Sequence, residues 1–238
     1  MPEIWFVSLN WAFQIFRESR LWLTKKFCDF AGASGPELEL RETPPPQPGP
    51  GQLAVQVHAA GLNRGEFITG QGLLGQLSKP KAMGMEAAGT IVAMGAGVTG
   101  WSLGQRVMGR ALGGFAEQTL MMASEAMPVP AHFDGLHAAS LPITYLVSHD
   151  MLVAQGQLAA GEWLLLNGAA SGVGTASLQL AQMIGAHTIG TSGQAHKLEV
   201  LKGLGLQASV LTRGGGFRDE VMRCTDGKGV NLAINPVG

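Results

Sequence analysis

Residues 161–193 decide the fold, and they read GEWLLLNGAASGVGTASLQLAQMIGAHTIGTSG. The short apolar run at 163–166 is typical of a parallel strand that is covered on both faces. The small residues at 168–174 then predict a tight turn into an amphipathic helix, and a second strand follows. We therefore predict a βαβ unit here, and we call residues 168–174 the glycine turn.

The start of the predicted helix is a candidate phosphate site. Free backbone N–H groups and the positive end of the helix dipole attract anions. We therefore expect a dinucleotide diphosphate to lie against five consecutive residues: Ala170, Ser171, Gly172, Val173 and Gly174. The turn departs from the G-x-G-x-x-G spacing, because Ala169 and Ser171 take the places of the first two glycines. Small residues that serve close packing alone remain the alternative, but the strand before and the helix after favour the nucleotide.

The end of the second strand indicates which dinucleotide binds. An NAD site normally places Asp or Glu there, against the ribose 2′-hydroxyl. Residues 187–193 contain no acid and instead offer the hydroxyls of Thr191 and Ser192, with Lys197 shortly after. Hydroxyl and ammonium donors bind a 2′-phosphate through charge-assisted hydrogen bonds, so NADPH is the expected cofactor. The alternative for Lys197 is a solvated surface lysine.

Composition is that of a metabolic protein with a buried core. The 238 residues are 46% hydrophobic and carry a net charge of −1, which gives no electrostatic reason to expect nucleic-acid binding. Cys28 and Cys224 lie too far apart in sequence for a Cys-x-x-Cys metal or redox pair. A reducing, cytoplasmic setting is the simplest one that this cysteine content allows.

The first 27 residues differ from the rest of the chain. Four apolar residues could share one face of a helix: Trp5, Leu9, Ala12 and Phe16. The segment opens with an acid and its basic residues come late, unlike a signal peptide, and we expect no membrane span. An interfacial helix, a packing arm and an extension outside the functional fold are the interpretations, of which we favour the last.

The front half after this extension is β-rich. Short alternating or apolar runs between turn signals predict strands at 37–40, 53–57, 89–94, 105–108 and 115–121. Such spacing suggests a small barrel-like domain. A helical segment at 135–156 then leads into the βαβ half.

Several segments occur in an order and spacing that resemble the medium-chain dehydrogenase/reductase superfamily. They are PGPGQ at 48–52, AGLN at 60–63, GMEAAG at 84–89, GQRV at 104–107, GGFAE at 113–117 and AASGVG at 169–174. The resemblance is closest to the zinc-independent NADPH:quinone oxidoreductase branch. It implies an α/β fold, with a GroES-like domain followed by an incomplete Rossmann domain with a doubly wound parallel sheet, and nicotinamide meeting substrate in the cleft between the domains.

The resemblance also implies a division of the chain. We expect an extension of uncertain role at 1–27, a GroES-like catalytic domain at 28–134, a bridging helix at 135–156 and a partial NADP-binding Rossmann domain at 157–238.

The zinc ligands of the related alcohol dehydrogenases are missing from the sequence. Those enzymes carry a Cys near the position of Asn63 and a His directly before the acid of the Gly-x-Glu motif, where this chain has Met85. A thioether with no neighbouring thiolate does not make a tetrahedral zinc site. The structural zinc lobe needs four cysteines, and this chain has two. We therefore expect no metal.

The resemblance implies hydride transfer from NADPH to a small quinone or α,β-unsaturated carbonyl. Such acceptors need only hydrogen bonds to the developing oxyanion. Asn63 is the expected donor, and bracing of its own turn is the alternative. Glu86 is expected to brace the domain by accepting hydrogen bonds, and action as a base is the alternative. Tyr145 is the candidate proton donor, with His149 one helical turn away and His137 nearby, and a buried or surface role is the alternative.

The end of the chain departs from the family pattern. Strands are expected near 208–211 and 230–234, and Asn235 then opens an N-P-V-G sequence that resembles the family's Asp-x-Val-Gly turn and its cofactor contact. A complete dinucleotide fold has roughly six strands, so we expect a truncated sequence that lacks the strand that usually forms the dimer. A homo-oligomer stays open. The alternative function is a catalytically inactive nucleotide-binding remnant, or a fragment of a longer enzyme.

Overall fold

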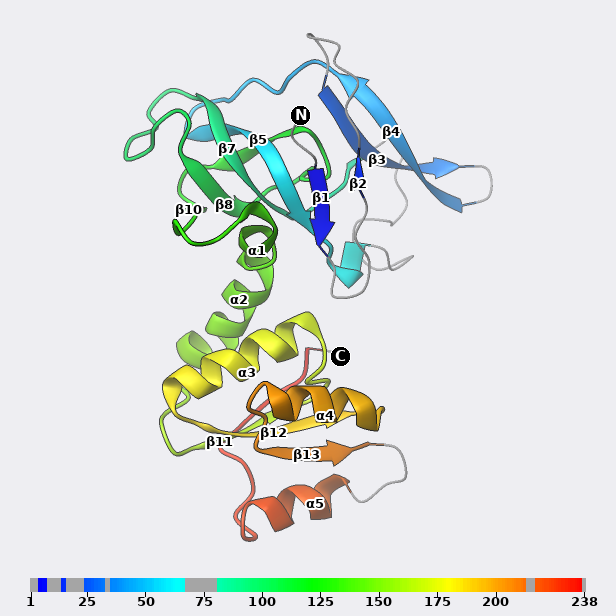
Figure 1. Ribbon diagram of the computed structural model, residues 1–238, viewed down its shortest axis with the longest axis vertical. Helices are drawn as coiled ribbons and strands as arrows, with labels where there is room; N and C mark the ends of the chain where they lie inside the picture. The colour runs from blue at the N-terminus through cyan, green and yellow to red at the C-terminus, as the bar shows by residue number, and fades with distance from the viewer. Residues whose placement is uncertain are drawn as a thin grey trace. The chain divides into compact units, whose positions relative to one another are not determined.

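The computed structural model describes residues 4–7, 14–15, 24–32, 35–66, 81–212 and 217–236. The chain divides into two compact units, Met1–Ile143 and Thr144–Gly238 (Figure 1). The first unit is rich in β-structure, and the second alternates strands with helices. None of the helices in the described ranges has the length and apolarity to cross a membrane.

The first unit is built around a seven-stranded sheet with the strand order β10-β8-β7-β5-β1-β2, in which β9 also pairs with β5. Its strands are β1 (Ile4–Val7), β2 (Gln14–Ile15), β5 (Gln52–Gly61), β7 (Glu86–Met94), β8 (Arg106–Arg110), β9 (Gln118–Met122) and β10 (Ala126–Pro128). A second, three-stranded sheet has the order β4-β3-β6. It contains β3 (Thr24–Gly32), β4 (Gly35–Thr43) and β6 (Lys81–Ala82). The pairings are antiparallel apart from β1 with β5.

Strand β5 lies at the centre of this unit because its apolar side chains have partners on all sides. Leu53, Val55 and Val57 are fully buried, and they pack with Ile91 of β7 and Met121 of β9. Two short helical segments complete the described part of the unit: the 3₁₀ helix η1 (Arg64–Glu66) and helix α1 (Gly135–Ala139). The β-rich front half is therefore confirmed.

The second unit contains a parallel sheet with the strand order β13-β12-β11-β14. Its strands are β11 (Trp163–Leu166), β12 (His187–Ser192), β13 (Ala208–Leu211) and β14 (Leu232–Ile234). Its helices are α3 (Gly172–Ile184), α4 (Ala195–Gly203) and α5 (Phe217–Cys224). Leu164 and Leu166 are fully buried beneath Leu178 and Ala181 of α3. This is the predicted βαβ unit, extended into a partial Rossmann domain.

The helical segment expected at 135–156 is interrupted. Helix α1 ends at Ala139, and a new helix, α2 (Pro142–His149), begins two residues after Ser140 and continues as the π-helix η2 (Asp150–Gln155). Proline lacks a backbone N–H, so it suits the first position of a helix and breaks the interior of one. The boundary between the two compact units falls inside α2.

Two further expectations differ from the structure. The strand expected at 115–121 begins only at Gln118, because the residues before it follow an irregular path in which Phe115 N–H donates to the Met83 carbonyl. Trp5 lies in strand β1, where it pairs with Ala59 of β5, so the helical face that the spacing allowed is not formed at this residue. Leu9, Ala12 and Phe16 lie outside the described residues.

Gly89 shows how closely the backbones of β5 and β7 approach each other. A Cβ atom at this position would lie 2.0 Å from the Gln56 carbonyl oxygen. We expect Gly89→Ala to lower the free energy of unfolding by about 1–3 kcal/mol, because the sheet must open to admit a methyl group. Gly65→Ala is the control, since no atom lies within 4 Å of its added Cβ. Urea unfolding measures both, and equal stability of the two variants would contradict this account.

Candidate functional site

The glycine turn lies between the end of β11 and the start of α3, as predicted. Ser171 caps the helix, and its Oγ accepts a hydrogen bond from Gly174 N–H at 3.1 Å. A Cβ atom on Gly174 would lie 2.6 Å from the Ala169 carbonyl oxygen and 2.7 Å from that of Gly168. Only glycine therefore lets the helix approach the turn this closely, which is the packing role of the third glycine in dinucleotide sites.

The turn presents backbone donors at the helix start. Within the described residues, the N–H groups of Ala170, Gly172 and Val173 donate to no other protein group. Unpaired N–H groups at a helix N-terminus favour an anion. The donors present therefore fit the diphosphate of a dinucleotide.

Thr191 lies beneath the turn. It is 1% exposed, its hydroxyl donates to Asn167 Oδ1 at 2.8 Å, and its Oγ1 accepts from Gly168 N–H at 3.2 Å. The Thr191 hydroxyl, which the sequence predicted to bind a 2′-phosphate, is thus hydrogen-bonded beneath the glycine turn. A direct contact between Thr191 and the cofactor stays a prediction.

Asn235 and Asn167 meet at the same edge of the sheet. Asn235 directly follows β14, and its Oδ1 accepts a hydrogen bond from Asn167 Nδ2 at 2.8 Å. Sequence reasoning missed Asn167. The signal that could have found it is a polar side chain placed directly after a buried parallel strand.

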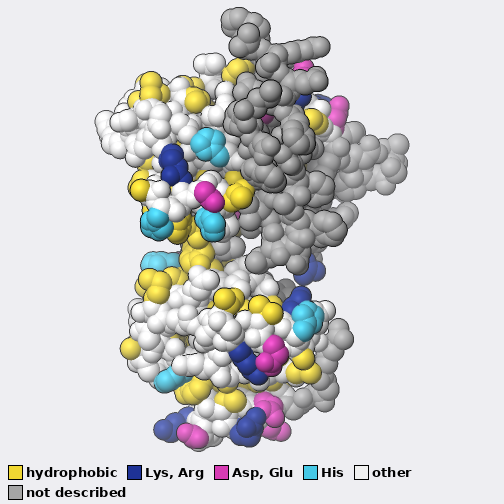
Figure 2. Space-filling view, in the orientation of Figure 1, with side chains coloured by type: hydrophobic (Ala, Val, Ile, Leu, Met, Phe, Trp, Pro, Cys, Tyr) yellow, Lys and Arg dark blue, Asp and Glu magenta, His cyan; other side chains and the backbone are white. Residues whose placement is uncertain are grey.

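Ser192 and Lys197 occupy the end of β12 and the first turn of α4. Ser192 is half-buried, and its Oγ accepts from Gln194 N–H at 3.2 Å, while Lys197 is exposed. On the face in view in Figure 2, Lys and Arg side chains lie interspersed with Asp and Glu. Because Ser192 is only half-buried and Lys197 is exposed, both predicted cofactor residues are accessible to solvent.

The first unit contains a separate polar cluster around Asn63. Its Nδ2 donates to Glu86 Oε1 at 2.8 Å, and Glu86 Oε2 accepts from Ile143 N–H at 2.7 Å. A Cβ atom on Gly61 would lie 2.2 Å from Glu86 Oε1, so the glycine makes room for the carboxyl group. The bracing role expected of Glu86 is confirmed, and Asn63 takes part in it.

Glu66 completes this cluster and was missed in the sequence. Its Oε2 accepts from Asn63 N–H at 2.9 Å, and its Oε1 has no hydrogen-bond partner among the described residues. Burial raises the pKa of Glu66 to about 7, with a further increase from the charge of Glu86. Burial also raises the pKa of Glu86. Glu66 was missed because nothing in the sequence around it indicates that this acid is buried.

Tyr145 lies on α2 as expected, one turn before His149. Its hydroxyl donates to Gln179 Oε1 on α3, and burial raises its pKa. His149 is exposed at the end of the same helix. The tyrosine therefore remains protonated at neutral pH and connects two helices of the second unit.

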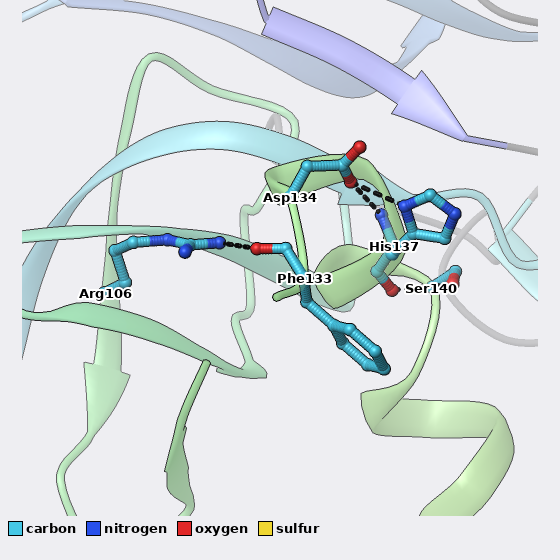
Figure 3. A network of polar contacts seen from close by, with 5 residues as sticks. All are labelled: Arg106, Phe133, Asp134, His137 and Ser140. Carbon is cyan, nitrogen blue, oxygen red and sulfur yellow. Dashed lines mark hydrogen bonds and ion pairs between the residues drawn. The ribbon is translucent and has the colours of Figure 1, made fainter. Parts of the chain in front are cut away.

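His137 belongs to a network that closes α1 (Figure 3). Asp134 caps this helix, and its Oδ1 accepts from His137 N–H and contacts His137 Nδ1, both at 2.8 Å. Ser140 Oγ donates to the His137 carbonyl at 2.8 Å, and Arg106 Nη2 donates to the Phe133 carbonyl. These contacts give His137 a structural role. Across the described ranges, no three His, Cys, Asp or Glu side chains lie together as a metal site would require.

Comparisons with known proteins identify the family. Residues 49–131 match the family described as alcohol dehydrogenase GroES-like domain, and residues 172–238 match that described as zinc-binding dehydrogenase. The chain belongs to the medium-chain dehydrogenase/reductase superfamily, as its sequence predicted.

Similar proteins include a rat protein named synaptic vesicle membrane protein VAT-1 homolog. It is 34% identical over 211 residues, which cover 88% of this chain and 52% of the relative. A quinone oxidoreductase from Pseudomonas syringae pv. Tomato DC3000 is 30% identical with a TM-score of 0.81, over 90% of this chain and 67% of that one. Mycobacterial Rv1454c, solved in complex with NADPH, is 28% identical with a TM-score of 0.80, over 90% and 67%. The chain spans about half the length of the curated relatives it matches.

The buried acid predicts a pH dependence of stability. Between its ordinary pKa of 4.5 and about 7, folded Glu66 keeps a proton that the unfolded chain releases, so rising pH destabilises the fold over this range. Relative to Glu66→Gln, the wild type should lose roughly 2 kcal/mol of unfolding free energy from the low end of this window to the high end.

Urea unfolding at several pH values measures this difference. Glu125→Gln is the control, because Glu125 lies exposed in the same unit and forms an ion pair with Arg110. Its profile should run parallel to that of the wild type. A parallel profile for Glu66→Gln as well would show that Glu66 is ionised in the fold.

Proposed function

We propose that this chain is an NADPH-dependent, zinc-independent oxidoreductase that reduces a quinone or an α,β-unsaturated carbonyl. The observation that carries the proposal is the glycine turn. Gly174 lets α3 lie close to the backbone of residues 168–169, and within the described residues the turn presents three backbone N–H groups that donate to no other protein group. The likeness to a quinone oxidoreductase supports the reaction class.

The cofactor choice rests on the end of β12. No Asp or Glu stands between His187 and Lys197, so no carboxylate is present there to accept from a ribose 2′-hydroxyl or to repel a 2′-phosphate. Ser192 and Lys197 are the donors proposed for that phosphate, and the amides of the glycine turn are those proposed for the diphosphate. The NADPH in the similar mycobacterial structure supports this choice.

The reaction is proposed to run without zinc because the ligand residues are absent. Met85 precedes Glu86, and no cysteine stands near Asn63. When bound, NADPH would supply a hydride, and its addition to a conjugated acceptor would place negative charge on the acceptor's oxygen. Hydrogen-bond donors stabilise such an oxyanion without a metal.

Asn63 is the proposed donor, and its brace is compatible with this role. A side-chain amide carries two N–H groups, and one of them is held by Glu86. The orientation of the amide is therefore fixed, and the second N–H remains to donate to the oxyanion. Tyr145 is the proposed proton donor, because its hydroxyl carries a proton at neutral pH and is held in place by Gln179.

The test is an assay of the 238-residue chain with NADPH and a simple benzoquinone, together with calorimetric titration of NADPH. Saturable binding with quinone-dependent NADPH oxidation supports the proposal. Binding without turnover supports the alternative, a nucleotide-binding chain that lacks catalysis on its own. No binding overturns the nucleotide site itself.

Lys197 should determine the preference for NADPH over NADH. We expect Lys197→Ala to weaken NADPH binding roughly tenfold by removal of a charge-assisted contact, while NADH affinity stays unchanged. Lys202→Ala is the matched control, because Lys202 lies exposed on the same helix and pairs with Glu199. Dissociation constants for both cofactors provide the measurement. If the two variants keep the wild-type preference alike, Lys197 does not contact the cofactor.

A further inference from the structure

The hydroxyl of Ser171 has a partner on one side only. Ser171 caps α3 with an extended backbone, and its Oγ accepts from Gly174 N–H at 3.1 Å. A backbone N–H can only donate, so the hydroxyl proton of Ser171 is not used in this contact. No group in the described part of the chain accepts that proton. Ser171 is half-buried, so its hydroxyl has access to a ligand.

Ser171 stands where the G-x-G-x-x-G motif has its second glycine. That glycine lets the backbone approach the diphosphate of a dinucleotide. A serine puts a side chain at this place of close approach, so the side chain either joins the contact or keeps the diphosphate away. The cap favours the first outcome, because it occupies the Ser171 oxygen as an acceptor and leaves a proton to donate.

The cap also replaces the donor that it uses. Gly174 N–H would otherwise be a further unpaired donor at the helix start. Hydrogen bonds in a series strengthen one another, so a hydroxyl that accepts from an N–H is a better donor. The Ser171 hydroxyl therefore takes over the role of this N–H, at a residue flanked by the unpaired N–H groups of Ala170 and Gly172.

We propose that the Ser171 hydroxyl donates a hydrogen bond directly to the diphosphate of the bound dinucleotide. The inference rests on the nucleotide site proposed above and adds a side-chain contact where the motif uses bare backbone. Diphosphate oxygens only accept, so a hydroxyl donor suits them. NADPH and NADH share the diphosphate, so this contact should serve both cofactors equally, in contrast to that of Lys197.

Two substitutions separate the hydroxyl donor from the helix cap. Glycine caps a helix almost as well as serine but has no hydroxyl, so we expect Ser171→Gly to bind each cofactor roughly threefold to tenfold more weakly, the effect of about one hydrogen bond. Aspartate also caps well, but its carboxylate only accepts and repels a diphosphate. We therefore expect Ser171→Asp to keep the wild-type melting temperature and to lose more affinity than Ser171→Gly.

The control is a second hydroxyl in the first turn of the same helix. Thr175 Oγ1 donates to the carbonyl oxygens of Ser171 at 2.7 Å and Gly172 at 3.1 Å, so its proton is already used within the protein. Thr175→Val removes this hydroxyl with little change of shape. It should alter the melting temperature alone and leave the affinity for both cofactors unchanged.

Calorimetric titration of NADPH and NADH into each variant, with its melting temperature, tests the inference. Equal losses for the two cofactors in Ser171→Gly support it. Unchanged or tighter binding by Ser171→Gly would show that the side chain does not contact the diphosphate or keeps it away. That result, wild-type affinity in Ser171→Asp, a loss confined to NADPH, or an equal loss in Thr175→Val would overturn the inference while the nucleotide site stands. If the wild type binds neither cofactor, the proposed function fails and this inference fails with it.

Discussion

The second unit depends on one constraint: no side chain fits at residue 174. The helix start lies so close to the backbone of Gly168 and Ala169 that an added Cβ would overlap carbonyl oxygens at 2.6–2.7 Å. That approach brings the N–H groups of the turn to the carboxyl edge of the sheet, next to the ends of β12 and β14. The candidate anion site is therefore a consequence of backbone packing, and side chains beneath it, such as Thr191, maintain its shape.

The first unit shows a related arrangement built from carboxyl groups. Glu86 lies where Gly61 lacks a side chain, and from there it holds Asn63 and the backbone of Ile143. Glu66 holds the same asparagine through its main chain. Buried acids without a cation are costly, which is why their pKa values rise. The fold retains this cost at a loop that carries a candidate catalytic amide, which is typical of polar groups that serve a site.

The sequence predicted what local patterns determine. The apolar run at 163–166 matches β11, because a parallel strand covered on both faces favours continuous apolar residues, and the strand expected near 208–211 matches β13. The single helical segment expected at 135–156 is divided in the structure, because a new helix begins at Pro142. The hydrogen bonds that support the candidate site were missed because they join distant residues: Asn167 and Asn235 lie 68 positions apart, and Gly168 and Thr191 lie 23 apart. A sequence pattern shows that a hydroxyl follows a strand, but it does not show whether the hydroxyl faces outward or lies under the turn.

The two parts of the proposed cofactor site should therefore differ in how readily substitution changes them. The backbone groups proposed to hold the diphosphate are kept in place by Gly174, by Ser171 and by the hydrogen bonds of Thr191, so most changes there also disturb the sheet. The 2′-phosphate would meet Ser192 and Lys197, which have solvent access and little packing to lose. Exposed substitutions usually cost little stability. In the proposed site, single substitutions at the end of β12 should therefore change cofactor preference, while changes at the glycine turn should also affect the fold.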